Sequence, residues 1–325
     1  QNCCHPMALH TRAGISTSQS FCSPARISMI SLFRQLATAG SSGTPGTNKG
    51  RGLPQKKPIP NVDKILLVGS GKGGVGKSTV SVNLAVAMAT AGYRVGLADA
   101  DIQGPSLATL LGLRGRRMEA EAPPAVGGGR PRLLPVEAHG LHCSSMSLLI
   151  PEGRAPVWRG HMLTSAVSQL LSGVAWPRTD VLLVDLPPGS GDVPLSVAQS
   201  VPAAACLLVA TAQRVAVADV ARHVDMMAAL RVPVLGVVHN MAAFRCPACS
   251  ARHPLFNSDA LGDLIRTADL KLLAELELEP GDAQALDDGR PSFLACPESP
   301  NTAEFASLAA SVARLLQLPP QPAAA

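Results

Sequence analysis

The segment that most constrains this chain is a glycine-rich loop, GKGGVGKS, which lies between an apolar run and a helix-like run. Residues 65–69 are apolar or small, and they predict a buried parallel strand. The glycines allow positive φ and carry no Cβ, so successive backbone N–H groups can converge on phosphate oxygens. The helix that follows directs the positive end of its dipole to the same place. Strand, loop and helix together match the phosphate-binding P-loop.

The residue types within this loop predict a site for Mg·ATP. We expect Lys77 to reach the β- and γ-phosphates and the Ser78 hydroxyl to ligate Mg²⁺. The expected nucleotide-binding residues are Gly71, Lys72, Gly73, Gly74, Val75, Gly76, Lys77, Ser78 and Thr79. The alternative is a glycine-rich loop that only turns a corner, and the strand before it and the helix after it count against that alternative.

Other polar side chains follow predicted strands, which is where open α/β sheets bind their ligands. The segment DADIQGPS begins at Asp99, after the strand at 94–98, and Asp185 ends the strand VLLVD. An aspartate at the end of such a strand is typical of a Walker B residue that holds Mg²⁺ through water. Gly189, in the next loop, can turn its N–H toward a γ-phosphate. Taken alone, the aspartates of DADIQGPS are also compatible with capping a turn before a helix.

A cysteine pair, Cys246-Pro-Ala-Cys249, follows soon after Asn240, which closes the strand VVHN. Two thiolates three residues apart in a tight turn can hold one metal ion or one edge of a cluster. A [4Fe–4S] cluster usually takes four cysteines, so two chains would supply the set that one lacks. Three alternatives stay open: a zinc site completed by His253, a redox pair, or inert thiols. Of the other cysteines, Cys143 and Cys206 are expected in the core, and Cys296 stays unassigned.

Apolar strands that alternate with helices predict an α/β domain with a doubly wound, mostly parallel sheet covered by helices on both faces. We place this domain at residues 63–318 and a disordered tail at 319–325. Besides the P-loop strand, the expected strands are 94–98, 181–186, 205–210 and 234–238, and the expected helices are 78–91, 157–172, 215–230, 258–267 and 302–316.

Charge is distributed unevenly along the chain. Residues 1–62 contain seven basic residues and no acid, which leaves 21 basic and 23 acidic residues in the remainder. The slightly acidic body and the 3% aromatic content argue against a nucleic-acid partner. No apolar run approaches the ~18 residues of a membrane span, so stable membrane insertion is not expected.

The acid-free start resembles a mitochondrial transit peptide, which we place at residues 1–37 and follow with a flexible linker at 38–62. This predicts localisation in the mitochondrial matrix. An ordinary disordered basic tail is the alternative.

The second lysine of the loop, Lys72, makes GKGGVGKS similar to the deviant Walker A loop of the family that includes ParA, MinD, the nitrogenase iron protein and the Mrp-type scaffold proteins. The resemblance implies a homodimer with ATP between the subunits and Lys72 reaching the partner's nucleotide. It also implies that Asp101 orients or deprotonates the attacking water, that Asp99 supports the Mg²⁺ shell and that Asn240 contacts the adenine edge. Lys72, Asp101 and Asp185 are therefore the expected catalytic residues. On spacing alone, Lys72 could be a solvated charge and Asn240 a turn former.

The order GKGGVGKS, DADIQGPS, VWRG, VDLPPGSGD, HNMAAFRCPAC and CPES is similar to the Mrp branch, whose members are iron–sulfur scaffold and carrier ATPases. The leader followed by RGLPQKKPI is most similar to its mitochondrial, nucleotide-binding-protein-like members. This implies a homodimer that holds a labile [4Fe–4S] cluster between paired Cys246 and Cys249, hydrolyses ATP weakly, and delivers the cluster to apoprotein acceptors during respiratory complex I assembly.

The chain departs from the usual Mrp pattern at Ala108, His161 and His239. None of the three replaces an expected phosphate, Mg²⁺ or cysteine ligand. Two other interpretations remain: a positioning ATPase of the ParA/MinD kind that acts on DNA or membrane, and a zinc-stabilised nucleotide-binding regulator.

Overall fold

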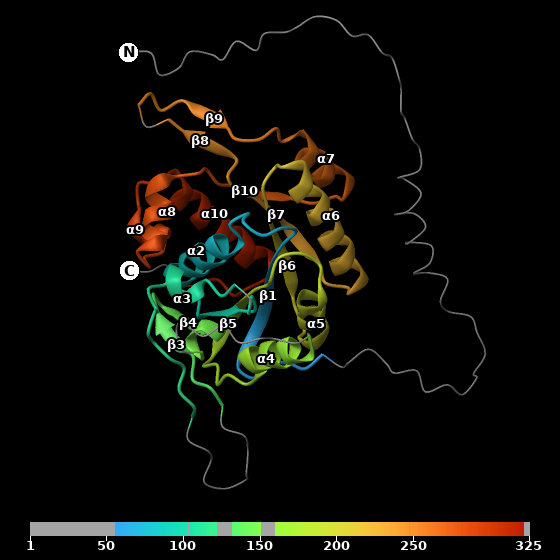
Figure 1. Cartoon of the computed structure of the whole chain (residues 1–325), viewed down its shortest axis with the longest axis vertical. Coiled ribbons are helices and arrows are strands. Elements are labelled where there is room, and N and C mark those ends of the chain that lie inside the picture. Colours follow the sequence, from blue (N-terminus) through green and yellow to red (C-terminus); the bar gives the residue numbers. More distant parts are fainter. Residues whose placement is uncertain (1–55, 103, 122–131, 151–159, 247, 322–325) are drawn as a thin grey trace, which may run out of the picture. The chain divides into compact units, whose positions relative to one another are not determined.

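The computed structural model describes residues 56–102, 104–121, 132–150, 160–246 and 248–321 (Figure 1). The predicted transit peptide, the linker up to residue 55 and the end of the predicted tail lie outside these residues. The folded part begins slightly before the expected start at Asp63, since Ile59 is buried and the first strand begins at Val62.

Within the described residues an eight-stranded sheet forms the centre of the fold, in the order β10-β7-β6-β1-β5-β2-β4-β3. All neighbouring strands run parallel except β3, which pairs antiparallel with β4. The strands of this sheet are β1 (Val62–Ser70), β2 (Val95–Asp99), β3 (Val136–Ala138), β4 (Leu141–Ser145), β5 (Thr179–Asp185), β6 (Ala205–Ala210), β7 (Val234–His239) and β10 (Leu272–Glu275).

Helices cover both faces of this sheet (Figure 1). One layer joins α2 and α10 with the short α3, α8 and α9, while α4 packs with α5 and α6 packs with α7. The helices are α2 (Lys77–Thr90), α3 (Leu107–Leu110), α4 (Gly160–Ser172), α5 (Asp192–Ser200), α6 (Arg214–Ala229), α7 (Asp259–Thr267), α8 (Pro280–Asp287), α9 (Ser292–Ala295) and α10 (Pro300–Leu315), with a 3-10 helix η2 (Met146–Leu148). This arrangement confirms the predicted doubly wound α/β fold.

The central strands are buried on both faces, which explains why they are continuously apolar in the sequence. Every residue of β2, β5 and β6 is buried. Helix α2 is buried along most of its length because it packs against the sheet and against α10. Predicted core cysteines Cys143 and Cys206 are both fully buried.

The sequence pattern predicted the long helices and the central strands but not the short elements. The predicted strands and long helices are present with ends shifted by a few residues, and the helix predicted at 157–172 is described from Gly160. Missing from the prediction were the strands β3, β4 and β10, the two-stranded sheet of β8 (Ala243–Arg245) and β9 (Arg252–Pro254), the helices α3, α5, α8 and α9, and η2. These elements are too short to show a periodic pattern of apolar residues. No described helix is long and apolar enough to cross a membrane.

Core packing around α2 gives the first prediction. Leu84 is completely buried, whereas Leu294 on α9 is 48% exposed. We expect Leu84→Ala to lower the free energy of unfolding by about 3 kcal/mol, because it removes apolar contacts and leaves a cavity. The matched control, Leu294→Ala, should change it by about 0.5 kcal/mol or less. Urea unfolding of both variants measures the difference, and equal losses would contradict the assignment of Leu84 to the core.

Candidate functional site

The carboxyl ends of the central strands bring the predicted nucleotide-site residues to one edge of the sheet (Figure 1). In the strand register, Asp99 at the end of β2 is the partner of Asp185 at the end of β5. The P-loop leaves β1, which is the next strand beyond β5, and connects directly to α2. Residues from segments separated by more than a hundred positions thus meet at the first turn of α2.

The P-loop has the backbone geometry that its glycines were expected to provide. Gly74 and Gly76 have φ of 79° and 83°, a region that favours glycine. A Cβ added at Gly74 would meet no atom within 4 Å, so the loop surface there is open. At Gly71, by contrast, an added Cβ would lie 2.5 Å from the backbone of α6. The loop is therefore packed tightly on one side and accessible where a phosphate would bind.

Asp185 is the centre of a buried polar cluster at the base of this loop. Its carboxylate accepts hydrogen bonds from the hydroxyls of Ser78 and Ser81, both at 2.6 Å, and lies 2.6 Å from Nζ of Lys77. Asp185 is fully buried and Lys77 is 6% exposed. The sequence analysis did not identify Ser81. Its position three residues after Ser78 on the same helix face could have indicated it.

Asp99 adds a second buried carboxylate to this cluster. It accepts hydrogen bonds from the backbone of Asp101 at 3.0 Å and from the hydroxyl of Ser145 at 3.1 Å. Burial and the neighbouring charge of Asp185 together raise the pKa of Asp99 to about 7, against the opposing charge of Lys77. Two carboxylates and a serine hydroxyl are hard oxygen donors, so a Mg²⁺ ion fits this arrangement and would relieve the repulsion.

The remaining predicted catalytic residues lie at the rim of the site. The side chain of Lys72 is exposed on the P-loop, and Asp101 is half-buried and accepts a hydrogen bond from the backbone of Gly104. Asp101 is linked to the buried Asp99–Asp185 cluster through its backbone N–H, which donates to Asp99. Thr79 is half-buried in the first turn of α2, and its carbonyl accepts a hydrogen bond from Asn83.

The loop after β5 is docked against the start of the P-loop. Gly189 has a φ of 82°, and its N–H donates to the carbonyl of Ser70 at 2.8 Å. Behind this contact lies His223 on α6, which is fully buried and has no hydrogen-bond partner on either ring nitrogen among the described residues. Its ring fits only because Gly69 lacks a side chain, since an added Cβ would lie 2.6 Å from Nε2. The sequence analysis did not identify His223, and nothing in its apolar surroundings indicated it.

Asn240 follows β7 and contacts the P-loop directly. Its amide nitrogen Nδ2 donates to the carbonyl of Val75 at 2.8 Å, and its backbone N–H donates to Ala210 at the end of β6. The next strand, β8, begins three residues later, at Ala243. The predicted adenine-contacting residue is thus close to the predicted cysteine loop.

The cysteine pair lies at the tip of the β8–β9 hairpin, which extends from the body of the domain (Figure 1). The turn is closed by two backbone hydrogen bonds, from Cys246 to Ala251 at 2.9 Å and from Ser250 to Cys246 at 2.8 Å. Cys246 is half-buried and Cys249 is exposed. The hairpin therefore presents the pair at the surface.

The base of the hairpin is fixed by charge. Arg245 and Arg252 are directly opposite each other in the strand register, and both donate to the carboxylate of Glu277. Opposed like charges destabilise a strand pair, and the shared carboxylate offsets this. Backbone groups of Glu277 are in turn held by Asn301 at the start of α10.

The other cysteines within the described part of the chain, Cys143, Cys206 and Cys296, do not resemble metal ligands. Burial raises the pKa of Cys143 and of Cys206 to about 12, so both stay protonated thiols at neutral pH. Burial and the charge of Asp282 also raise the pKa of Cys296, whose thiol donates to the carbonyl of Gly281. Among the described residues of this chain, no group of three or more His, Cys, Asp or Glu side chains is arranged to hold a metal ion. His253 is exposed on β9 and does not complete such a group with the cysteine pair.

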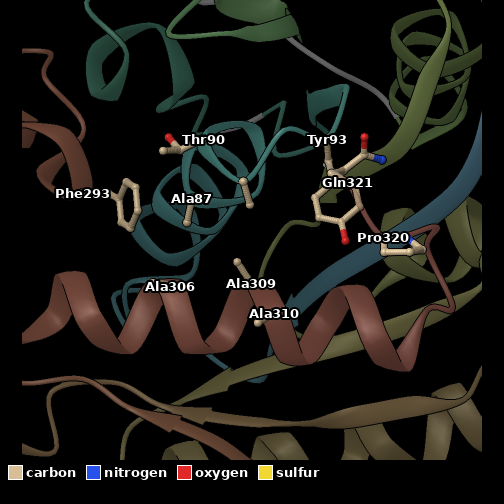
Figure 2. Close-up of a pocket in the computed structure, with 10 residues that line it drawn as sticks. Ala87, Thr90, Tyr93, Phe293, Ala306, Ala309, Ala310, Pro320 and Gln321 are labelled. Carbon is tan, nitrogen blue, oxygen red and sulfur yellow. The ribbon is translucent and has the colours of Figure 1, made fainter. Parts of the chain in front are cut away.

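A cavity of about 400 Å³ lies near the far end of α2, between that helix and α10 (Figure 2). Half of its ten lining residues are alanine, and Tyr93 and Phe293 are its aromatic side chains. The lining residues include no carboxylate, histidine or cysteine for a metal ion and no lysine or arginine for a phosphate.

Burial of His223 predicts a pH dependence of stability. Burial lowers the pKa of His223 from 6.5 to about 4, with the Gly189 backbone opposing the shift. Unfolding lets the ring take up a proton between these values, so stability is kept above pH 6.5 and falls as the pH drops toward 4. Between pH 6.5 and pH 4, we expect His223 to lower the free energy of unfolding by roughly 3 kcal/mol. His223→Leu should remove that loss. The control, His253→Gln at an exposed position, should leave the pH profile of urea unfolding unchanged. A wild-type profile in the His223 variant would contradict the buried neutral ring.

Comparison with solved structures supports the fold assignment. The chain is similar to the nucleotide-binding protein in complex with ADP from Archaeoglobus fulgidus, with 35% identity, a TM-score of 0.60 and coverage of 71% of this chain and 88% of that one. It also shares the fold of the cell division ATPase MinD from Pyrococcus furiosus, at 22% identity and a TM-score of 0.54, with 78% of this chain and 99% of that one covered.

Comparison with known sequences identifies the family. The chain is 40% identical over 273 residues to the iron–sulfur cluster transfer protein NUBPL of Mus musculus, which covers 83% of each protein. It is also 40% identical to the iron–sulfur cluster carrier protein of Aquifex aeolicus, over 81% of this chain and 70% of that protein. The family model for ParA, described as NUBPL iron-transfer P-loop NTPase, matches residues 61–313. With the P-loop, the paired aspartates and the cysteine hairpin in place, the chain belongs to the ParA family of NUBPL iron-transfer P-loop NTPases.

Proposed function

We propose that this protein is an ATP-binding carrier that holds a [4Fe–4S] cluster between two copies of the chain and delivers it to apoproteins. The observation that carries this proposal is the pair Cys246 and Cys249 at the tip of a hairpin, two residues of a type that ligates iron–sulfur clusters. Among the described residues, they do not form a group of three or more His, Cys, Asp or Glu side chains that could hold a metal ion. Two thiols are half of the usual ligand set for a [4Fe–4S] cluster. A symmetric pair of hairpins would complete the set at a surface, from which a cluster can be passed on.

The nucleotide site is proposed to bind Mg·ATP through the chain's own polar groups. Lys77 would exchange its contact with Asp185 for the β- and γ-phosphates, and Ser78, Asp99 and Asp185 would hold Mg²⁺ directly or through water. Gly189 would turn its N–H from Ser70 toward a γ-phosphate and so distinguish ATP from ADP. The open surface at Gly74 and the raised pKa of Asp99 support this assignment, since one offers space and the other gains from a cation.

Lys72 and Asp101 are proposed to act across the homodimer. Lys72 is exposed on the P-loop, as a residue that contacts a partner subunit would have to be. It would contact the partner's nucleotide, while Asp101 orients the attacking water. Slow hydrolysis is expected, because a carrier needs two conformational states rather than rapid turnover.

The finer assignment places the protein in the mitochondrial matrix, with complex I subunits among its acceptors. The acid-free start of the chain and the identity to the mouse NUBPL protein support it. Similar carrier proteins from bacteria support only the general role in cluster transfer.

The two rival functions explain fewer of these features. A ParA/MinD-like positioning ATPase would share the nucleotide site but would give the cysteine hairpin no role. A zinc ion held within one chain would need further ligands beside the cysteine pair, and His253 does not supply a third within the described part of the chain. Zinc shared between two chains is the outcome that metal analysis distinguishes from a cluster.

Metal analysis tests the cluster. After anaerobic reconstitution with iron and sulfide, we expect about four iron atoms per two chains, with a charge-transfer absorption. Cys246→Ala and Cys249→Ala should each abolish that absorption, because each removes two of the four ligands. The control is Cys296→Ala, which removes a half-buried thiol outside the hairpin and should keep the iron content. Full iron content in the doubly substituted hairpin, or bound zinc in place of iron, would overturn the carrier assignment.

The two lysines of the P-loop should behave differently. We expect Lys77→Ala to weaken ATP binding by at least about 100-fold, since it removes a buried charge-assisted contact to phosphate. Lys72→Ala should keep the affinity for Mg·ADP within about three-fold but lower the rate of ATP hydrolysis by about ten-fold or more, the lower range of a charge supplied in trans. Calorimetry and phosphate release measure the two effects. Equal loss of ADP affinity in both variants would show that Lys72 contacts the nucleotide of its own chain.

A further inference from the structure

The expected nucleotide site and the cysteine hairpin are joined by a very short stretch of chain. Asn240 contacts the P-loop, and Cys246 at the hairpin tip follows only six residues later. If hydrogen bonds fix the backbone of so short a stretch, the two sites cannot move independently of each other.

Asn240 is fixed tightly at its P-loop end. Its Nδ2 donates to the carbonyl of Val75 at 2.8 Å, and a Cβ added at the next residue, Gly76, would lie 2.1 Å from the same nitrogen. The backbone N–H of Asn240 is anchored on Ala210 at the end of β6. The side chain is 7% exposed. The amide therefore has little freedom to move unless the P-loop moves with it.

The stretch after Asn240 is braced by a second segment, residues 276–278, which we call the strap. Ala242 donates to the carbonyl of Leu276, and Leu278 donates to the carbonyl of Ala243, so the strap pairs with the entry to β8. The strap residue Glu277 also binds both hairpin arginines. Between Asn240 and the hairpin, only Met241 has a positive φ, at 55°. The hairpin base and the strap thus form one braced unit that begins at the P-loop.

We propose that Asn240 is a positioning residue that couples the nucleotide state of the P-loop to the arrangement of the cysteine hairpin. A nucleotide that orders the P-loop fixes the carbonyl of Val75, and the hydrogen bond from Asn240 passes this constraint to the braced unit. This inference rests on the proposed function and adds the physical connection between its two sites. Since a single neutral hydrogen bond carries the coupling, its expected size is about five-fold, at the low end of site-to-site coupling.

This role differs from contact with the adenine edge, and the two make different predictions. The hydrogen bond to Val75 uses Nδ2, whereas recognition of the adenine amino group would use Oδ1. Loss of base recognition would change the preference for ATP over GTP. Loss of coupling would change how the hairpin responds to any nucleotide.

Cysteine alkylation in the cluster-free, reduced full chain measures the hairpin directly. Iodoacetamide labelling of Cys246 and Cys249 is mapped by mass spectrometry without nucleotide, with Mg·ADP and with Mg·adenylyl-imidodiphosphate. In the wild type, we expect nucleotide to change the labelling rate about five-fold. In Asn240→Ala, the labelling rates with and without nucleotide should differ by less than about two-fold, while the nucleotide affinity stays within about ten-fold of wild type. We call the quotient of these two rates the labelling ratio. Asn240→Asp, which replaces the Nδ2 donor by an oxygen, should show the same loss and guards against an effect of the smaller side chain.

His253→Gln is the matched control. His253 is exposed on β9, and its substitution leaves the hydrogen bond from Asn240 to Val75 and the contacts of the arginines with Glu277 in place, so the labelling ratio should stay at the wild-type value. A wild-type ratio in both Asn240 variants would overturn the inference, as would a loss of the ATP preference with the ratio retained.

Calorimetric titration of nucleotide distinguishes a failure of the coupling from a failure of the proposed function. If nucleotide binds and wild-type labelling is unaffected, the coupling is wrong and the proposed carrier function stands. If no nucleotide binds, both the coupling and the nucleotide part of the proposed function are wrong.

Discussion

The structure depends on two carboxylates held close together out of water, at the ends of neighbouring strands. Asp99 and Asp185 are strand-register partners and are both buried. Such a pair costs free energy, and the chain offsets it with Lys77, the hydroxyls of Ser78 and Ser81 on α2, and Ser145 on β4. The cluster therefore helps to fix the register of β2 against β5 and the position of α2 on the sheet. It also leaves a concentration of negative charge that a magnesium ion would neutralise.

Three neighbouring segments contact the P-loop and restrict its movement. Helix α6 presses on its first glycines, the loop at Gly189 is bonded to Ser70, and Asn240 holds Val75 from the other side. These contacts come from segments that follow different strands, so a change in the conformation of the P-loop could affect several neighbouring segments. Of these segments, the one that begins at Asn240 leads to the cysteine pair over the fewest residues. In this view, the cysteine hairpin connects the proposed nucleotide site to the surface.

The positions that break local rules coincide with these contacts. His223 is buried without a hydrogen-bond partner among the described residues, Arg245 faces Arg252 across a strand pair, and Met241 has a left-handed backbone conformation. Each feature is unfavourable by itself and is held in place by its surroundings, as is common at functional sites. The same features escaped the sequence analysis, because propensity and periodicity describe favourable local choices. Only Glu277, 32 residues beyond Arg245 in the chain, explains why the arginine pair is tolerated.

The sequence by itself determined the local elements: the P-loop between its strand and helix, the apolar strands of a parallel sheet, and the spacing of the cysteine pair. These depend on neighbouring residues, so their types and order are sufficient to predict them. Strand order was decided only by the tertiary structure, because pairing β1 with both β5 and β6 requires contacts far apart in the chain. That order selects Ser81 and Ser145 as partners of the aspartates, places His223 behind Gly69, and brings Asn240 to Val75. Such contacts leave no periodic pattern in the sequence, since each is made between segments that meet only after the sheet has formed.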